Sequence, residues 1–237
     1  VRGSWGERFQ VYLRNNLLAT QRLLEGIKTL GKEIKVVYSS SSSVYGNTDR
    51  LPTPETTLPR PFSPYGTTKL AAEHLCFLYH ANYGVPVVAL RYFTVYGPRQ
   101  RPDMAFHILI RCLLEGRPFR LLGDGRQTRD FTYVDDIVRA NLAAAERPVE
   151  GEVFNIGGGS RIALRDAVTL VERISGHSVV IQREPARPGD VRDTFADTEK
   201  ARRLLGFSPS VSLEEGLARQ FRWQQSLREA GSIPPGG

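Results

Sequence analysis

The sequence predicts an α/β protein with a doubly wound, mostly parallel sheet and a smaller α/β part towards the C-terminal end. Two observations lead to this fold class. Short apolar runs rich in β-branched residues alternate with longer stretches in which apolar residues recur at helical spacing. Serine-rich or glycine-containing segments follow several of the short runs, at the carboxyl ends of strands where such sheets bind ligands.

The individual elements follow from the same patterns. Residues 7–30 carry a wide apolar face that stops at Gly31, which predicts a long helix. Residues 34–38 form a short apolar run, which predicts a buried parallel strand leading into the serines at 39–43. Further helices are expected at 65–83, 104–115, 135–146, 163–175, 198–205 and 213–229. Further strands are expected at 85–92, 119–122, 131–134, 153–156 and 179–182.

Composition limits the class of protein. The chain has 237 residues, 41% apolar and 24% charged, which suffices for one or two domains with buried cores and excludes a disordered chain. No apolar stretch reaches the length of a membrane span, and residues 1–10 lack the apolar core of a signal peptide, which favours a cytoplasmic protein. Cys76 and Cys112 lack the spacing of a zinc site or a disulfide framework, so buried, reduced thiols and no metal are expected.

The charge balance favours anionic partners. A net charge of +7 arises from 32 Lys and Arg residues against 25 Asp and Glu residues. The arginines are scattered over loops and helix ends, and the sequence has no signature of a nucleic-acid-binding fold. We therefore favour phosphorylated small molecules, or a plain solvated surface, over nucleic acid.

Two segments together indicate chemistry. A serine-rich strand end at 39–46 precedes the segment Ser-Pro-Tyr-Gly-Thr-Thr-Lys at 63–69, which opens a helix. Tyr65 and Lys69 share one helix face, where an ammonium favours the phenolate and lowers the tyrosine pKa as a general base requires. A strand-end serine hydroxyl would complete the proton relay. Alone, the Tyr–Lys pair is more often a solvated surface pair and a serine run more often a loop, but the combination is far more specific.

With these segments the sequence resembles the extended short-chain dehydrogenase/reductase family, and within it the nucleotide-sugar epimerase/dehydratase group. The resemblance covers essentially the whole chain, in separate motifs that follow the family's order. The motifs are residues 15–16, 39–46, 63–69, 90–98, 123–125, 129–136, 187–190, 196–197 and 205–207.

The resemblance implies a domain division. It implies a Rossmann-type NAD-binding domain, incomplete at its N-terminal side, that comprises residues 1–98 and 127–158. A sugar-nucleotide-binding domain would comprise residues 99–126 and 159–230, followed by a polar tail at 231–237. A homodimer held by two helices of each subunit is also implied, although packing on the sheet explains their apolar faces equally well.

The resemblance further implies roles for single residues, with NAD as the cofactor and a UDP-sugar as the substrate. Tyr65 is implied as the catalytic base, Lys69 as the residue that lowers its pKa and holds a cofactor ribose, and Ser41 as the hydroxyl partner. Cofactor contacts are implied for Asn16, Ser39, Tyr65 and Lys69. Substrate contacts are implied for Thr94, Arg129, Arg187 and Asp190, although a lone arginine is more often a surface charge or part of a structural ion pair.

The family's glycine-rich dinucleotide turn is not found in the chain. Residues 157–159 are three glycines after a predicted strand, but their spacing and late position favour a simple turn. About 60 to 80 further residues, or two βα units, are therefore expected upstream, at roughly 30 residues per βαβ unit. On this interpretation the chain alone binds NAD weakly or not at all, and the functional assignment concerns the parent enzyme.

The reaction is inferred from the residues around the catalytic hydroxyl. By resemblance, 4,6-dehydratases have an Asp-Glu pair directly after it, and uronate decarboxylases have a Glu two positions before the strand-end tyrosine. Here those positions hold Ser42 and Ser43. We therefore expect a 4-epimerase that acts through a transient 4-keto intermediate, with a dehydratase or decarboxylase as the alternative. A cofactor-free scaffold protein is the alternative of another class, in which the Ser41, Tyr65 and Lys69 set would have no purpose.

The substrate is inferred from a second group of residues. Thr94 and the segment 99–104 resemble UDP-glucuronate 4-epimerases. Arg101, with the hydroxyls of Ser42, Ser43 and Thr94, is suited to hold a C6 carboxylate by charge-assisted hydrogen bonds. Arg101 would serve equally for a phosphate or for the surface alone. We favour UDP-glucuronate over UDP-glucose or UDP-galactose.

Overall fold

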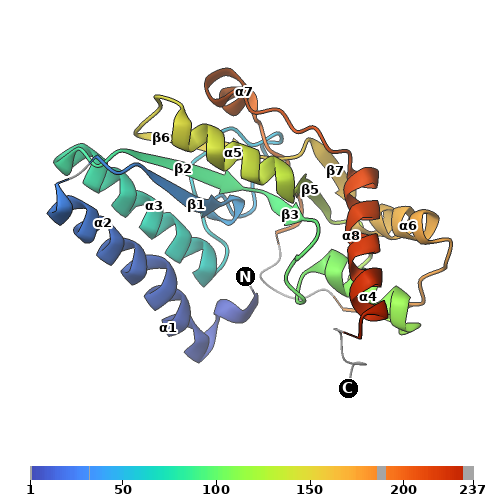
Figure 1. The fold of residues 1–237 in the computed structure, drawn as a ribbon. Coiled ribbons are helices and arrows are strands. Elements are labelled where there is room, and N and C mark those ends of the chain that lie inside the picture. Colours follow the sequence, from blue (N-terminus) through green and yellow to red (C-terminus); the bar gives the residue numbers. More distant parts are fainter. Residues whose placement is uncertain (1, 32, 186–190, 232–237) are drawn as a thin grey trace.

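A computed structural model describes residues 2–31, 33–185 and 191–231 of the chain (Figure 1). Within these residues, a three-stranded parallel sheet lies beside a three-stranded mixed sheet and a two-stranded sheet. Helices cover both faces of the parallel sheet (Figure 1), and further helices pack against the other two sheets. This arrangement confirms the predicted α/β class.

The first long helix is continuous but changes type along its length. After a separate 3₁₀ turn at Arg2–Ser4, it runs through Gly6–Arg8 (3₁₀), α1 (Phe9–Tyr12), a π-helical segment (Leu13–Leu18) and α2 (Ala19–Leu30). Gly31 ends it with a φ of 59°, a left-handed conformation that glycine adopts at low cost. The helix predicted at 7–30 is confirmed, whereas its π-helical segment is not recognisable from apolar periodicity.

The parallel sheet forms the half of the molecule that contains the N-terminal helix. Its strands, in spatial order, are β1 (Val36–Ser41), β2 (Val87–Tyr92) and β6 (Glu152–Ile156). One face packs against α2 and α3 (Pro64–Tyr83), and the other packs against α5 (Val134–Glu146) and α7 (Glu199–Leu205). Because both faces are covered, the central strand β2 is apolar and buried almost throughout. The predicted doubly wound sheet is confirmed.

The other half has its own apolar core. Its strands are β3 (Thr94–Tyr96), β4 (Phe119–Leu122), β5 (Thr128–Tyr133), β7 (Ser160–Ala163) and β8 (Ile181–Glu184). β5 pairs in parallel with β3 and antiparallel with β7, and β4 pairs in parallel with β8. Its helices are α4 (Ala105–Glu115), α6 (Leu164–Ser175) and α8 (Leu213–Glu229). Their apolar faces enclose Phe106 and Phe131, whose rings stack with centroids 4.2 Å apart.

The differences from the sequence prediction lie in short strands and in strand ends. β3 and β7 were not expected, because a strand of three or four residues is defined by a partner elsewhere in the chain. The strand expected at 131–134 begins at Thr128, since its first residues pair with β7. The strands expected at 34–38, 85–92 and 179–182 each begin two residues later. The domain boundaries stay a prediction.

Other expectations concern composition. Cys76 and Cys112 are buried, unpaired thiols, as predicted. Among the residues that the structure describes, none of the helices combines the length and apolarity that crossing a bilayer requires. The described part of the chain also has no group of His, Cys, Asp or Glu side chains arranged to hold a metal ion.

Candidate active site

The end of β1 and the first turn of α3 meet at one place. Ser41 is the last residue of β1, and its side chain accepts a hydrogen bond from the backbone N–H of Ser43 at 3.2 Å. The chain then turns through a short 3₁₀ segment, Ser42–Val44, in which Ser42 and Ser43 are half-buried. The predicted serine cluster therefore lies at the carboxyl edge of the sheet, where open α/β sheets bind ligands.

The N-terminus of α3 places Tyr65 next to this edge. The Ser63 hydroxyl caps the helix by accepting from the backbone N–H of Gly66 at 3.1 Å. Pro64 follows in the first turn, where its missing N–H leaves no helical hydrogen bond unmade. The backbone N–H of Tyr65 donates to the buried Ser4 hydroxyl at 3.1 Å, a contact that the sequence analysis missed.

Gly66 allows the helix to approach the serine turn closely. A Cβ on Gly66 would lie 2.5 Å from the carbonyl oxygen of Ser43 and 3.2 Å from the Cβ of Pro61. Real Cβ atoms essentially never come within 3.0 Å of another heavy atom, so a larger residue would push the helix away. A glycine directly after the tyrosine is the sequence signal for this close approach.

Ser41 and Tyr65 form the reactive pair of the site. The Ser41 hydroxyl lies near the Tyr65 phenol and favours its ionised form. Burial raises the pKa of the Tyr65 phenol, while the Ser41 hydrogen bond and the positive charge of Arg101 act in the opposite direction. The pKa of Tyr65 thus lies above its ordinary value, whereas the sequence predicted a lowered one, because burial outweighs both favourable interactions.

Lys69 lies one helical turn after Tyr65, on the same side of α3. Its ammonium donates to the carbonyl oxygen of Ser39 at 2.8 Å and lies 5.3 Å from the centroid of the Tyr38 ring. Burial lowers the pKa of Lys69. The structure therefore places this cation at the end of β1, and its effect on the Tyr65 pKa stays a prediction.

Asn16 connects the first helix to the same turn of α3. It lies in the π-helical segment, and its amide donates to the hydroxyl of Thr68 at 3.0 Å. The Thr68 hydroxyl in turn donates to the backbone carbonyl of Tyr65 at 2.9 Å. Short π-helical segments are frequent at functional sites, and this one brings Asn16 beside the Tyr65 turn.

A second group of predicted residues comes from the other half of the molecule. Thr94 is half-buried at the start of β3. Arg101 forms a two-pronged ion pair with Asp103, with both N–O distances at 3.0 Å, and both side chains are 69% exposed. The Arg101 loop is fastened through Gln100, whose amide donates to the carbonyl of Val95 at 2.9 Å.

The remaining predicted substrate residues are farther along the chain. Arg129 lies on β5 and donates to the carbonyl oxygens of Thr128 and Arg192, both at 2.9 Å. It thereby ties β5 to the segment that follows residues 186–190. Arg187 and Asp190 lie outside the described residues.

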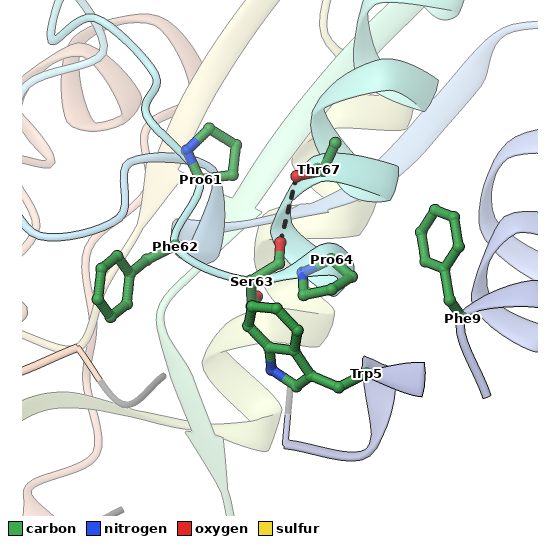
Figure 2. Close-up of a pocket in the computed structure, with 7 residues that line it drawn as sticks. All are labelled: Trp5, Phe9, Pro61, Phe62, Ser63, Pro64 and Thr67. Atoms are coloured by element: carbon green, nitrogen blue, oxygen red, sulfur yellow. Dashed lines mark hydrogen bonds between the residues drawn. The ribbon is translucent and has the colours of Figure 1, made fainter. Parts of the chain in front are cut away.

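An apolar groove flanks the first turn of α3. It has a volume of about 620 Å³ and combines side chains of the N-terminal segment with those of the loop before α3 (Figure 2). Its lining residues are Trp5, Phe9, Pro61, Phe62, Ser63, Pro64 and Thr67. Trp5 and Phe62 are 57% and 49% exposed, so the groove is a solvent-facing surface next to Tyr65.

The donors at the β1 edge suit a dinucleotide. Lys69 supplies a partly buried cation, Asn16 a primary amide, and Ser39 a hydroxyl whose Oγ lies 3.2 Å from the Oη of Tyr92. Ribose hydroxyls and a carboxamide are groups that such donors bind. Residues 157–159, by contrast, join β6 to the antiparallel strand β7 rather than opening a helix, as predicted for a simple turn.

Comparison with known proteins identifies the family. The family model described as the NAD dependent epimerase/dehydratase family matches residues 3–157, more than half of the chain. The chain belongs to this family. The structural neighbours of this family member are NAD-dependent epimerases and dehydratases, in agreement with the predicted Rossmann-type sheet.

Proteins of similar sequence and structure align with most of this chain. It is 44% identical over 228 residues to the uncharacterized UDP-glucose epimerase YtcB of Bacillus subtilis, covering 96% of this chain and 72% of YtcB. A UDP-glucuronic acid 4-epimerase from Bacillus cereus, solved with UDP-glucuronic acid and NAD, is 49% identical with a TM-score of 0.92, covering 96% of this chain and 72% of that one. MoeE5, solved with UDP-glucose and NAD, is 47% identical with a TM-score of 0.90, and the match covers 94% of this chain and 75% of MoeE5.

Proposed function

We propose that the protein carrying this chain is an NAD-dependent 4-epimerase of a UDP-sugar. The observation that carries the proposal is the placement of Ser41, Tyr65 and Lys69 where the end of β1 meets the first turns of α3, with Lys69 bound to the Ser39 carbonyl. Membership of the family and similarity to proteins solved with NAD and UDP-sugars support it.

Each side chain has a defined task in the proposed reaction. When bound, NAD would supply the hydride acceptor and then the hydride donor for C4 of the sugar. Tyr65 takes the proton of the 4-hydroxyl and later gives it back, which leaves a transient 4-keto sugar between the two steps. Ser41 donates a hydrogen bond to the phenolate as it forms, and the positive charge of Arg101 favours the same ionised form. Lys69 and Asn16 hold the cofactor.

The residues after Ser41 favour epimerisation over elimination. Ser42 and Ser43 follow directly, and neither supplies a carboxylate that would act as an acid on C5 or C6. The keto sugar therefore turns over and is reduced on its other face. Without an added acid or base in this turn, the elimination of water is not supported.

The arrangement favours UDP-glucuronate as the substrate. Arg101 already binds a carboxylate, that of Asp103, in the planar two-pronged geometry that a C6 carboxylate would take. An exposed ion pair of this kind is worth only about 0 to 1 kcal/mol, so a substrate carboxylate replaces Asp103 at little cost. The hydroxyls of Ser42, Ser43 and Thr94 would complete this subsite, and Arg129, Arg187 and Asp190 would bind the UDP part.

A homodimer is part of the proposal. Large apolar side chains are exposed along the first helix and α3, where two helices of each subunit would pack together. They are Val11, Leu13, Leu18, Leu23, Leu30, Leu78 and Tyr83. We also propose that residues 1–237 alone bind NAD weakly, because residues 157–159 form a turn between strands and not a phosphate-binding turn before a helix.

Product analysis tests the proposed function. The protein expressed from its complete reading frame is incubated with NAD and either UDP-glucuronate or UDP-glucose, and the nucleotide sugars are identified by NMR and mass spectrometry. Formation of the C4 epimer without a change of mass is the expected result. Loss of water or carbon dioxide would establish a dehydratase or decarboxylase instead. No turnover of either sugar, with no NAD bound, would favour a binding or scaffold protein.

A further inference from the structure

A row of buried polar side chains crosses the parallel sheet directly behind the Ser41–Tyr65 pair. Ser40 on β1 is in register with Arg91 on β2, and Arg91 is in register with Asn155 on β6. All three are buried, with exposed fractions of 3%, 4% and 0%. Neighbouring residues of parallel strands that are in register point to the same face, so the row faces one helix layer.

Glu73 of α3 completes this row. Its carboxylate binds the Arg91 guanidinium through two contacts, at 2.5 Å and 3.1 Å, and accepts the hydroxyl of Ser40 at 2.5 Å. Glu73 itself is only 2% exposed. The other side of the Arg91 guanidinium donates to the Oη of Tyr45 at 2.8 Å, and that hydroxyl donates to Asn155 at 2.7 Å. Every charged atom of the pair is thus engaged by a neighbour.

The network lies directly beside the candidate active site. Ser40 lies between Ser39, whose carbonyl binds Lys69, and Ser41, which lies near Tyr65. Glu73 lies one helical turn beyond Lys69, so it is on the same side of α3. Three successive turns of α3 therefore contact three successive residues of β1, and the Glu73 contact is the one that the proposed chemistry leaves unused.

The energetics of burial favour a positioning role for the Glu73–Arg91 pair over a stabilising role. Removing two charges from water is costly, and well-packed apolar residues of similar volume often give equal or higher stability. A two-pronged Arg–carboxylate contact, in contrast, permits only one relative arrangement of its partners. We propose that Glu73 and Arg91, through Ser40, are positioning residues that hold α3 in register with β1 so that Tyr65 and Lys69 meet Ser41 and Ser39. This inference rests on the proposed epimerase function.

A triple variant separates positioning from stability. Ser40→Ala, Glu73→Leu and Arg91→Met together replace the network by apolar side chains and leave no partner charge buried. In the protein expressed from its complete reading frame, with NAD, we expect a melting temperature at or above that of the wild type. We also expect kcat to fall about 100-fold with KM within about threefold, because a displacement of about 1 Å at the reacting groups costs that much.

A single variant tests the inference if the triple variant does not fold. Ser40→Ala leaves the Glu73–Arg91 pair intact and removes only its contact with β1, and we expect kcat to fall about tenfold. The matched control is Arg173→Met with Glu214→Leu, which removes an exposed Arg–Glu pair between α6 and α8, at 2.8 Å, and should leave kcat unchanged. Wild-type kcat in a folded triple variant, or in Ser40→Ala, overturns the inference.

A second readout needs no substrate and therefore separates this inference from the proposed function. The phenolate absorbance of Tyr65 is isolated by subtracting the spectrum of each protein with Tyr65→Phe added. If the network holds Ser41 against Tyr65, its removal moves the Ser41 hydroxyl away from the phenol and shifts the Tyr65 titration to higher pH. An unchanged titration overturns the inference. If the wild type turns over neither UDP-sugar, the proposed function fails, and the titration still decides the positioning role.

Discussion

Replacement of Gly66 by Ala should separate α3 from the serine turn. The new Cβ would lie 2.5 Å from the Ser43 carbonyl oxygen, where ordinary contact begins at 3.4 Å, so the helix end has to move by about 1 Å. Alanine favours a helix over glycine by about 0.8 to 1 kcal/mol, whereas overpacking costs about 1 to 3 kcal/mol. We therefore expect a net loss of up to about 2 kcal/mol, and a kcat about 100-fold lower because Tyr65 is displaced from Ser41.

The matched control is Gly26→Ala in α2. A Cβ on Gly26 meets no atom within 4 Å, so the same exchange should stabilise the protein by up to about 1 kcal/mol and leave kcat unchanged. Scanning calorimetry resolves the two variants, since 1 kcal/mol corresponds to about 2 to 4 °C in a protein of this size. If Gly66→Ala has the same melting temperature as Gly26→Ala and the same kcat as the wild type, the close approach of α3 to the serine turn is refuted.

Three further predictions concern the buried Asp130 of β5, Arg101, and the caps of α3 and α8. Burial raises the pKa of Asp130 from 3.8 to about 6, so this carboxyl contributes stability below pH 4 that is lost as the pH rises through 6. The difference in unfolding free energy between wild type and Asp130→Asn should therefore decrease by about 2 kcal/mol between pH 4 and pH 7 in denaturant titrations, and a constant difference would contradict the shift. Arg101→Gln should raise KM about tenfold or more for UDP-glucuronate but not for UDP-glucose, with exposed Arg99→Gln as the control, and an equal rise in KM for both sugars would argue against a carboxylate subsite. Ser63→Ala and Ser212→Ala each remove a helix cap and should each cost about 1 kcal/mol, but only Ser63→Ala should lower kcat, which steady-state assays would show.

Much of the fold is encoded in local patterns. The helices at α3, α4, α5, α6, α7 and α8 begin within one residue of their predicted positions, because caps and apolar spacing are local signals. The short strands β3 and β7 were missed, since their pairing depends on β5, far away in sequence. The π-helical segment around Asn16 was missed because the apolar face continues through it.

The site was predictable in its parts but not in its electrostatics. The sequence placed Ser41 at a strand end and Tyr65 and Lys69 at the start of a helix. The structure brings these segments together. The direction of the Tyr65 pKa was not predictable, because it depends on how deeply the phenol is buried and on Arg101 from the other half of the molecule. The polar row of Ser40, Arg91 and Asn155 likewise becomes visible only with the strand register.

The most direct test of the proposed 4-epimerisation is the conversion of UDP-glucuronate labelled with deuterium at C4. The protein expressed from its complete reading frame, with NAD, and its Tyr65→Phe variant are compared by NMR of the products. We predict a C4 epimer that keeps the deuterium at C4, and no conversion by Tyr65→Phe because the base is missing. Loss of the label to solvent, or wild-type conversion by Tyr65→Phe, would contradict the account.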